Sequence, residues 1–142
     1  MSKICIVVAR FYEDIADELV NGATACFDAQ GIAYDIVAVP GAFEIPAAIR
    51  LAVASTRYSG YLALGCVIRG ETTHYDYVCA ESARGLNMLA LKHMAAIGYG
   101  ILTVEDKQQA FVRAAVTQGN KGRDAAEAAL RMIAIRKEMG VQ

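Results

Sequence analysis

The sequence lacks several features that would define whole classes of protein. It has no tryptophan and only two prolines among its 142 residues, and its formal net charge is −1. No uninterrupted apolar stretch of about 20 residues exists to cross a membrane. No basic excess marks it as a nucleic-acid-binding protein. Residues 1–3 run straight into an apolar strand. This apolar run is too short for the core and cleavage region of a signal peptide, so we expect a cytoplasmic protein.

The four cysteines also lack a functional pattern. They stand at Cys5, Cys26, Cys66 and Cys79, and no pair has the spacing of a metal site or a redox motif. Cys5 falls in an apolar run and Cys26 on the apolar face of a predicted helix. A free cysteine behaves as a small hydrophobe. We therefore expect reduced, mostly buried thiols and no metal site.

What the sequence does contain is an alternation of strand and helix patterns, with 56% apolar residues. The predicted strands are 4–9, 34–39, 61–68 and 100–104. The predicted helices are 13–30, one from about residue 43, 75–97, 106–115 and 122–139. This order predicts a single domain over residues 1–142, an α/β three-layer sandwich with a four-stranded parallel sheet flanked by helices on both faces. By analogy with flavodoxin-like folds, we expect the strand order 2-1-3-4.

Two of the predicted helices are more apolar than a lone small domain requires. Helix 75–97 carries Leu, Met and Val residues around its whole circumference, and helix 122–139 is rich in alanine. A homo-oligomer would cover the extra apolar surface. The alternative is that the alanines only favour helix formation.

The chemically unusual residues follow the predicted strands. They occur in four segments, which are 10–12, 40–44, 69–74 and 103–105. Ligands bind beyond the carboxyl ends of the strands in open α/β sheets. The four segments therefore predict a binding site at one edge of the sheet.

The third segment is the most informative. Gly70 is followed by Thr72 and Thr73 at a helix start, where free backbone N–H groups and hydroxyls favour an anion. Capping of the helix by either threonine is the alternative. His74 lies beside this site, and a histidine side chain suits proton transfer near neutral pH, although a structural role is equally consistent. His93 lies in the middle of the predicted helix and is interpreted as non-functional.

Other candidates remain ambiguous on spacing alone. Phe11 fits either a stacking platform or the core. Glu44 is explained by the dipole of the helix that it opens. Arg113 and Lys121 are cations that fit either a solvated helix and a turn or an anionic ligand.

Taken together, these segments resemble the lumazine synthase family. The matching stretches are Arg10-Phe11, residues 40–46, residues 65–78, residues 100–103, Gln109-Ala110 and residues 119–122. The block Gly-Cys-Val-Ile-Arg-Gly-Glu-Thr-Thr-His is long and specific, and the matches cover nearly the whole chain in order.

The resemblance implies a transferase of riboflavin biosynthesis. Members condense 5-amino-6-(D-ribitylamino)uracil with 3,4-dihydroxy-2-butanone 4-phosphate to give 6,7-dimethyl-8-ribityllumazine, phosphate and water. The implied reaction uses no metal and no organic cofactor, and the implied partners are these two small molecules. Members form homopentamers, and some assemble pentamers into a cage or associate with riboflavin synthase. No nucleic-acid or membrane partner is implied.

The resemblance also implies roles for thirteen residues. Proton transfer falls to His74. The implied pyrimidine- and ribityl-binding residues are Phe11, Ala42, Phe43, Glu44, Cys66, Val67 and Ile68. The implied phosphate-binding residues are Glu71, Thr72 and Arg113. Tyr99 and Lys121 complete the site, from an adjacent subunit together with Arg113.

Three departures from the family pattern accompany the resemblance. Tyr99 stands where phenylalanine is common, and Tyr12 where asparagine is frequent. The chain also starts almost at its first strand, without the extra strand of many cage-forming relatives, so we expect a pentamer rather than a cage. Alternative functions on the same fold are a non-catalytic flavin- or lumazine-binding or scaffold oligomer, and a riboflavin synthase of the archaeal type.

Overall fold

The computed structural model describes residues 3–141, which alternate between strands and helices as the sequence predicts. The strands are β1 Lys3–Ala9, β2 Tyr34–Val39, β3 Tyr58–Ile68 and β4 Ile97–Val104. The helices are α1 Glu13–Ala29, η1 Ala42–Glu44, α2 Ile45–Ser55, α3 His74–Lys92, α4 Lys107–Ala114 and α5 Lys121–Glu138. The short η1 is a 3₁₀ turn that leads directly into α2.

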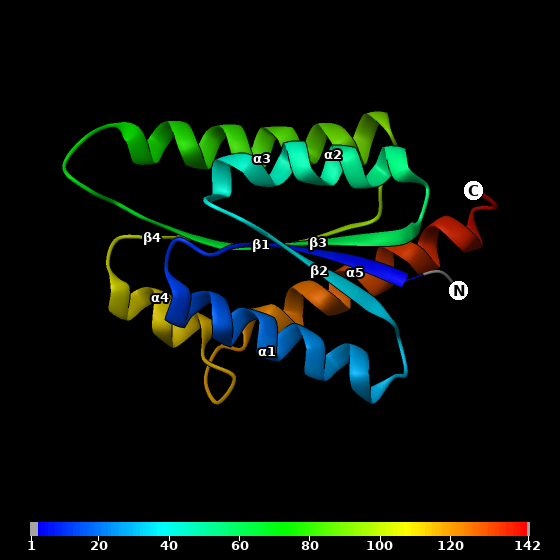
Figure 1. The fold of residues 1–142 in the computed structure, drawn as a ribbon, viewed down its shortest axis with the longest axis horizontal. Helices are drawn as coiled ribbons and strands as arrows, with labels where there is room; N and C mark the ends of the chain where they lie inside the picture. The colour runs from blue at the N-terminus through cyan, green and yellow to red at the C-terminus, as the bar shows by residue number, and fades with distance from the viewer. Residues whose placement is uncertain (1–2, 142) are drawn as a thin grey trace.

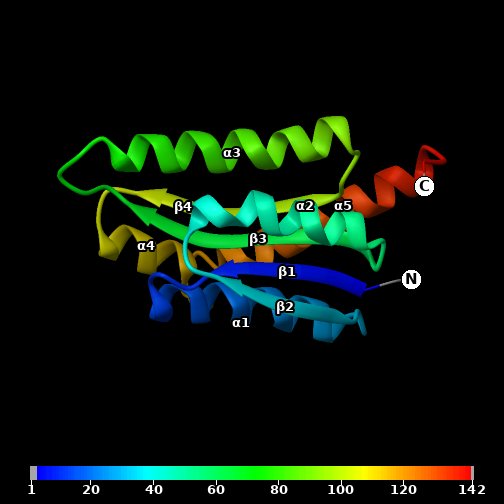
Figure 2. The ribbon, with the colours of Figure 1, turned by 45° about the horizontal axis from the view of Figure 1, so that its top comes forward.

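The strands form one parallel sheet in the order β2-β1-β3-β4 (Figure 2). Strand β1 pairs with both β2 and β3, so Val7 lies between Val37 and Ala63. The two central strands are buried on both faces, which explains why their sequences are continuously apolar. The predicted three-layer α/β class and the strand order 2-1-3-4 are both confirmed.

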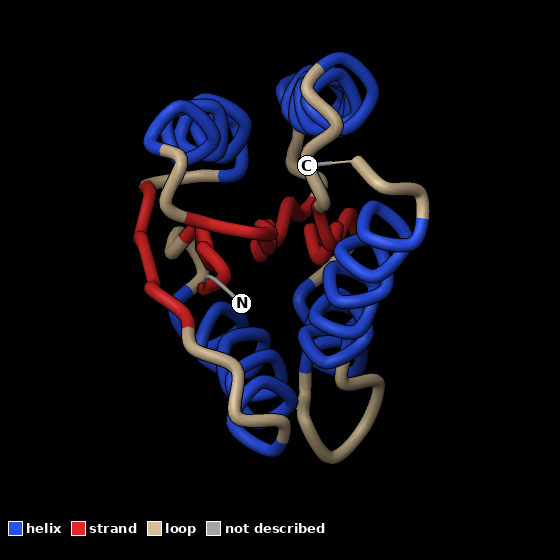
Figure 3. The backbone as a smooth tube through the Cα atoms, turned by 90° about the vertical axis from the view of Figure 1, so that its right-hand side faces the viewer, coloured by secondary structure: helices blue, strands red, loops and turns tan. Residues whose placement is uncertain are grey.

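The helices divide between the two faces of the sheet. Figure 1 shows α2 and α3 above the sheet and α1, α4 and α5 below it, and Figure 3 shows the same layers from one end. Successive residues of β1 point to opposite faces, so they enter two separate cores. Ile4, Ile6 and Val8 pack with α1 and α5, and Cys5, Val7 and Ala9 pack with α2 and α3. No helix within residues 3–141 is both long and apolar enough to cross a membrane.

Strand β4 begins earlier than the sequence predicts. The sequence predicts a strand over residues 100–104, opened by Gly98-Tyr99-Gly100, but β4 already starts at Ile97. A Cβ at Gly98 would lie 2.0 Å from the carbonyl oxygen of Ala125, and one at Gly100 would lie 2.9 Å from the Ala125 Cβ. The two glycines therefore let α5 lie directly against the strand, which is a packing role and not a turn.

Helix α3 also ends earlier than predicted, at Lys92 instead of residue 97. Met94 takes a left-handed conformation with φ of 52°, which stops the helix, and Ala95 donates its N–H to the Leu89 carbonyl at 3.3 Å. The buried Ala95 and Ala96 then lead into β4. His93 consequently lies at the C-cap of the helix and not in its middle.

Candidate active site

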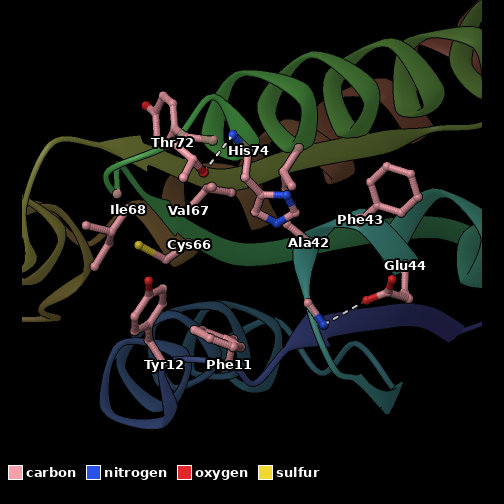
Figure 4. Close-up of a pocket in the computed structure, with 14 residues that line it drawn as sticks. Phe11, Tyr12, Ala42, Phe43, Glu44, Cys66, Val67, Ile68, Thr72 and His74 are labelled. Carbon is pink, nitrogen blue, oxygen red and sulfur yellow. Dashed lines mark hydrogen bonds between the residues drawn. The ribbon is translucent and has the colours of Figure 1, made fainter.

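A concave pocket of about 520 Å³ lies at the carboxyl edge of the sheet (Figure 4). Its volume is in the range of small-molecule sites. Its walls come from the segments after β1, β2 and β3 and from the first turns of α3. The lining residues are Phe11, Tyr12, Gly41, Ala42, Phe43, Glu44, Cys66, Val67, Ile68, Gly70, Thr72, His74, Tyr75 and Val78.

Exposed aromatic rings line this pocket. Phe11 is 73% exposed and Phe43 is 55% exposed, so neither ring belongs to the core. The ring of Phe11 meets that of Tyr12 edge to face, with centroids 4.9 Å apart and an interplanar angle of 81°. Such a contact covers at most one face of the Phe11 ring, so at least one face stays open. An exposed aromatic face in an apolar pocket suits stacking on a planar heterocycle.

The floor of the pocket is the end of β3, from Cys66 to Ile68. Cys66 is only 8% exposed. Burial, with smaller contributions from the charges of Asp14 and Cys79, raises the pKa of the Cys66 thiol to about 12. The thiol therefore stays protonated at neutral pH and is a poor nucleophile. The floor can therefore serve a ligand as a surface with backbone polar groups, and not as a source of a reactive thiol.

The other cysteines have the same inert character. All four thiols are free, with Cys5 and Cys66 buried and Cys26 and Cys79 half-buried. Burial is the main cause that raises the pKa of each one, to about 11 for Cys5. The expectation of mostly buried thiols is met by Cys5 and Cys66, while Cys26 and Cys79 are half-buried.

Glu44 forms one side of the pocket through a local turn. Its Oε1 atom accepts a hydrogen bond from the Gly41 N–H at 3.0 Å (Figure 4), and its own N–H donates to the Gly41 carbonyl at 3.1 Å. These bonds fix the carboxylate at the start of the helical segment, as a helix dipole favours. The second carboxylate oxygen, Oε2, makes no hydrogen bond within the described chain and can accept from a ligand hydroxyl.

The loop before α3 brings Thr72 and His74 to the pocket. The Thr72 hydroxyl accepts a hydrogen bond from the His74 N–H at 3.3 Å, so this threonine does cap the helix start. Thr73 occupies the N-cap position without a side-chain capping bond. His74 is the first residue of α3, one residue before the predicted start. Its ring points into the pocket beside Ala42 (Figure 4).

Nine of the thirteen residues singled out in the sequence line this pocket together. The four others do not. Glu71 lies exposed in the loop between the lining residues Gly70 and Thr72. Tyr99 lies in a separate groove between α3 and β4, together with Ala83, Arg84, Leu86, Asn87, Ala90 and Ile97.

Arg113 and Lys121 lie in the helical layer on the opposite face of the sheet from α3 (Figure 1). Arg113, in the last turn of α4, donates to the Gln109 carbonyl at 3.1 Å. Lys121, the first residue of α5, has its Nζ 3.6 Å from a carboxylate oxygen of Asp124. Within one chain, neither cation is part of the pocket.

Five lining residues are not among these thirteen. They are Tyr12, Gly41, Gly70, Tyr75 and Val78. All five lie inside segments that the sequence placed at the sheet edge or directly after them. Val78 follows His74 by four residues, a spacing that places two side chains on one face of a helix. That spacing was the signal that could have identified Val78.

The described residues contain no cluster of three His, Cys, Asp or Glu side chains that could hold a metal ion. The groups present instead suit a planar, hydroxylated ligand and an anion: an aromatic platform, backbone groups on the floor, a carboxylate, a helix N-terminus and a histidine. A parallel α/β sandwich with such a pocket at its carboxyl edge defines an enzyme or binding protein for small molecules.

Comparison with known proteins narrows this class. A family model described as 6,7-dimethyl-8-ribityllumazine synthase matches residues 1–137, and the chain belongs to this family. A relative named 6,7-dimethyl-8-ribityllumazine synthase 1, from Rhizobium meliloti, is 52% identical over 144 residues, covering 98% of this chain and 94% of the relative. A relative named 6,7-dimethyl-8-ribityllumazine synthase, from Sphingopyxis alaskensis, is 50% identical over 141 residues, covering 99% of both chains.

Proposed function

We propose that this protein condenses 5-amino-6-(D-ribitylamino)uracil with 3,4-dihydroxy-2-butanone 4-phosphate to form 6,7-dimethyl-8-ribityllumazine in riboflavin biosynthesis. The observation that carries the proposal is the convergence of Phe11, Ala42–Glu44, Cys66–Ile68, Thr72 and His74 on one pocket in a chain of this family. A pocket that unites a planar-ring platform with an anion-favouring helix start suits these two substrates.

The pyrimidine and its ribityl chain are assigned to the apolar half of the pocket. The open face of Phe11 stacks on the ring, and backbone groups of Cys66–Ile68 contact the ring edge. Ala42 and Phe43 hold the ribityl chain. The free carboxylate oxygen of Glu44 accepts hydrogen bonds from ribityl hydroxyls.

The phosphate of the second substrate is assigned to the start of α3. Glu71 and Thr72 offer backbone N–H groups and a hydroxyl there, and the dipole of the 19-residue helix favours an anion. Arg113 adds a charge-assisted bond to the phosphate, and Lys121 adds positive charge. Both cations come from a neighbouring copy of the chain.

The chemistry needs proton transfers more than a strong nucleophile. The 5-amino group attacks the ketone, and loss of water gives an imine. Phosphate then leaves by elimination, the resulting enol tautomerises to a ketone, and the ribityl nitrogen closes the ring with loss of a second water. His74 moves protons in these steps. Holding both substrates in register supplies most of the acceleration, a contribution that reaches ~7–11 kcal/mol in ideal cases.

The proposal includes assembly of the chain into a homopentamer. Leu51 on α2 and Tyr77 and Leu91 on α3 are large apolar side chains that are each at least 68% exposed, more than an isolated chain usually leaves in water. In a ring of copies, the face that carries them meets a neighbour, whose Arg113 and Lys121 complete the pocket, while Tyr99 packs at the same interface. The free cysteines are consistent with a reducing, cytoplasmic location.

The direct test measures lumazine formation by absorbance and fluorescence with both purified substrates, corrected for the uncatalysed reaction. We expect saturable formation that disappears when the sugar phosphate is omitted. A folded, oligomeric sample with no rate above background would overturn the proposal and favour a lumazine-binding scaffold. Lumazine supplied alone distinguishes a riboflavin synthase, which would convert it.

Sharing of the site between copies has its own test. His74→Ala is expected to lower kcat by about 10²-fold or less, because general acid–base groups contribute about 10²–10⁴-fold and positioning dominates here. Arg113→Ala is expected to raise KM for the sugar phosphate and to leave KM for the pyrimidine unchanged. In mixed rings of the two variants, about a quarter of the interfaces regain both groups, so activity should recover. If the two residues act within one chain, mixing restores nothing.

A further inference from the structure

Arg69 joins the ends of β3 and β4 at the edge of the pocket. It is the first residue after β3, and its backbone N–H donates to the Val104 carbonyl at 3.0 Å, which extends the strand pairing by one bond. Its Nε atom lies 3.0 and 3.3 Å from the two carboxylate oxygens of Glu105, the residue after β4. The carboxylate is thus held against the loop that begins at Arg69.

The same guanidinium also contacts the first turn of α3. Its Nη1 atom lies 3.4 Å from a carboxylate oxygen of Asp76, and its carbon lies 4.3 Å from the centroid of the Tyr75 ring, a cation–π contact. Arg69 therefore bridges the two ends of the segment 69–76. This segment carries Glu71, Thr72 and His74.

The segment has little other support. Residues 69–74 are all exposed, and a Cβ at Gly70 would meet nothing within 4 Å. Thr73 makes no side-chain capping bond, and the bond from the His74 N–H to the Thr72 hydroxyl joins the loop only to the first residue of α3. By contrast, Glu105 is anchored on its far side, because its backbone N–H donates to the Gln109 side chain of α4 at 2.8 Å. Arg69 is the link between this anchor and the loop.

We propose that Arg69 is a positioning residue that fixes the phosphate-binding loop through Glu105, Asp76 and Tyr75 without touching the substrate. Arg69 is not among the residues that line the pocket. Its planar guanidinium is directed at the carboxylates of Glu105 and Asp76. Small displacements of groups that hold a substrate can cost large factors in rate. The inference rests on the proposed function, since the loop is the assigned phosphate site.

The test is a double-mutant cycle with Arg69→Gln, Glu105→Ala and the double variant, followed by steady-state kinetics. We expect Arg69→Gln to raise KM for the sugar phosphate about tenfold and Glu105→Ala about threefold, with KM for the pyrimidine within about twofold of wild type. The double variant should be no worse than Arg69→Gln alone, because Glu105 acts only through Arg69. Arg131→Gln, which removes an exposed ion pair to Glu138 at the far end of α5, is the matched control and should change neither constant.

Amide hydrogen exchange gives a readout that does not depend on catalysis. In Arg69→Gln and Glu105→Ala, the amides of Asp76 and Tyr77, which donate to the Thr73 carbonyl at 3.0 and 3.4 Å, should exchange faster than in wild type, while those of β1 stay unchanged. A rise in KM for Arg69→Gln but not for Glu105→Ala would overturn the proposal, because the guanidinium would then bind phosphate directly. Additive effects, or unchanged exchange in both variants, would overturn it too. If wild type forms no lumazine, the proposed function fails, and exchange alone still decides the positioning role.

Discussion

Helices α1 and α5 meet each other at Gly22 and Gly122, and α5 meets β4 at Gly98 and Gly100, whereas α2 and α3 leave several large apolar side chains exposed on the other face. On the first face, a Cβ at Gly122 would lie 2.0 Å from the Leu19 carbonyl oxygen, so the two helices touch backbone to backbone. On the second face, Leu51 and Leu91 are 72% and 74% exposed. The first face is closed within one chain where α1 meets α5, and the second exposes apolar side chains that a neighbour would cover in the proposed ring.

The largest effect is expected where the first layer is tightest. Gly98→Ala adds one methyl group, but its Cβ would lie 2.0 Å from the Ala125 carbonyl oxygen, so the strand and α5 must separate. We expect the free energy of unfolding to fall by about 3 kcal/mol in a urea titration. Gly70→Ala is the matched control: its Cβ has open space, and the change should stay within about 0.5 kcal/mol. Equal losses in both variants would contradict the backbone contact.

A charge introduced on the exposed face of the second layer is expected to dissociate the oligomer and to leave the fold of each chain intact. Leu91→Asp places a carboxylate on the exposed face of α3, where a partner copy would have to bury it unpaired. We expect dissociation of the oligomer in sedimentation, with the helical circular dichroism retained. Ala25→Asp, on the exposed side of α1, should leave the oligomer intact. Dissociation by the α1 variant alone would reverse the comparison.

The smallest effect concerns the amino end of the second layer, which is closed by polar groups. The Tyr58 hydroxyl donates to Asp35 at 2.7 Å, and this bond, with burial second, raises the pKa of Tyr58 to about 12. The same bond, followed by the one from Lys3, lowers the pKa of Asp35. Tyr58 is therefore hydrogen-bonded to the same carboxylate that forms an ion pair with Lys3, whose Nζ lies 3.0 Å from Asp35.

A raised pKa in the folded state means that the Tyr58 contribution is fully present below the ordinary pKa of 10 and is lost as pH rises through about 12. Wild type should therefore be more stable than Tyr58→Phe at neutral pH, and the difference should shrink over that alkaline range. Urea titrations across this range, with tyrosinate absorbance followed in parallel, measure it. A difference that is constant with pH would show that the hydrogen bond is not its source.

Most of the fold was predictable because each strand is a continuous apolar run and each helix has a periodic face. The boundary errors of more than two residues are the start of β3, at Tyr58 and not residue 61, and the segment between residues 93 and 100. Met94-Ala95-Ala96-Ile97 has good helix formers, so local propensity favours continuing α3, and only the packed fold stops it at Met94. Gly98 and Gly100 resemble turn residues, and their packing against α5 depends on a helix more than 20 residues away.

The candidate site divides in the same way. Residues that directly follow a strand, such as Phe11 and Thr72, were predictable because parallel strands end at one edge. Tyr12 and Tyr75 were missed because a tyrosine beside a motif has no distinct pattern. Arg113 and Lys121 could not be placed by strand order, because they lie in helices on the opposite face of the sheet.

The position of these two cations has a consequence for how the rate depends on protein concentration. In the proposed ring, Arg113 and Lys121 of a neighbouring copy reach the pocket only while the copies stay associated. An isolated chain would keep Phe11 and the floor of the pocket, and so the proposed pyrimidine site, but it would lose the two cations proposed to hold the phosphate. On dilution, turnover per chain should therefore fall more steeply than pyrimidine binding, and the reaction order in protein should rise above one.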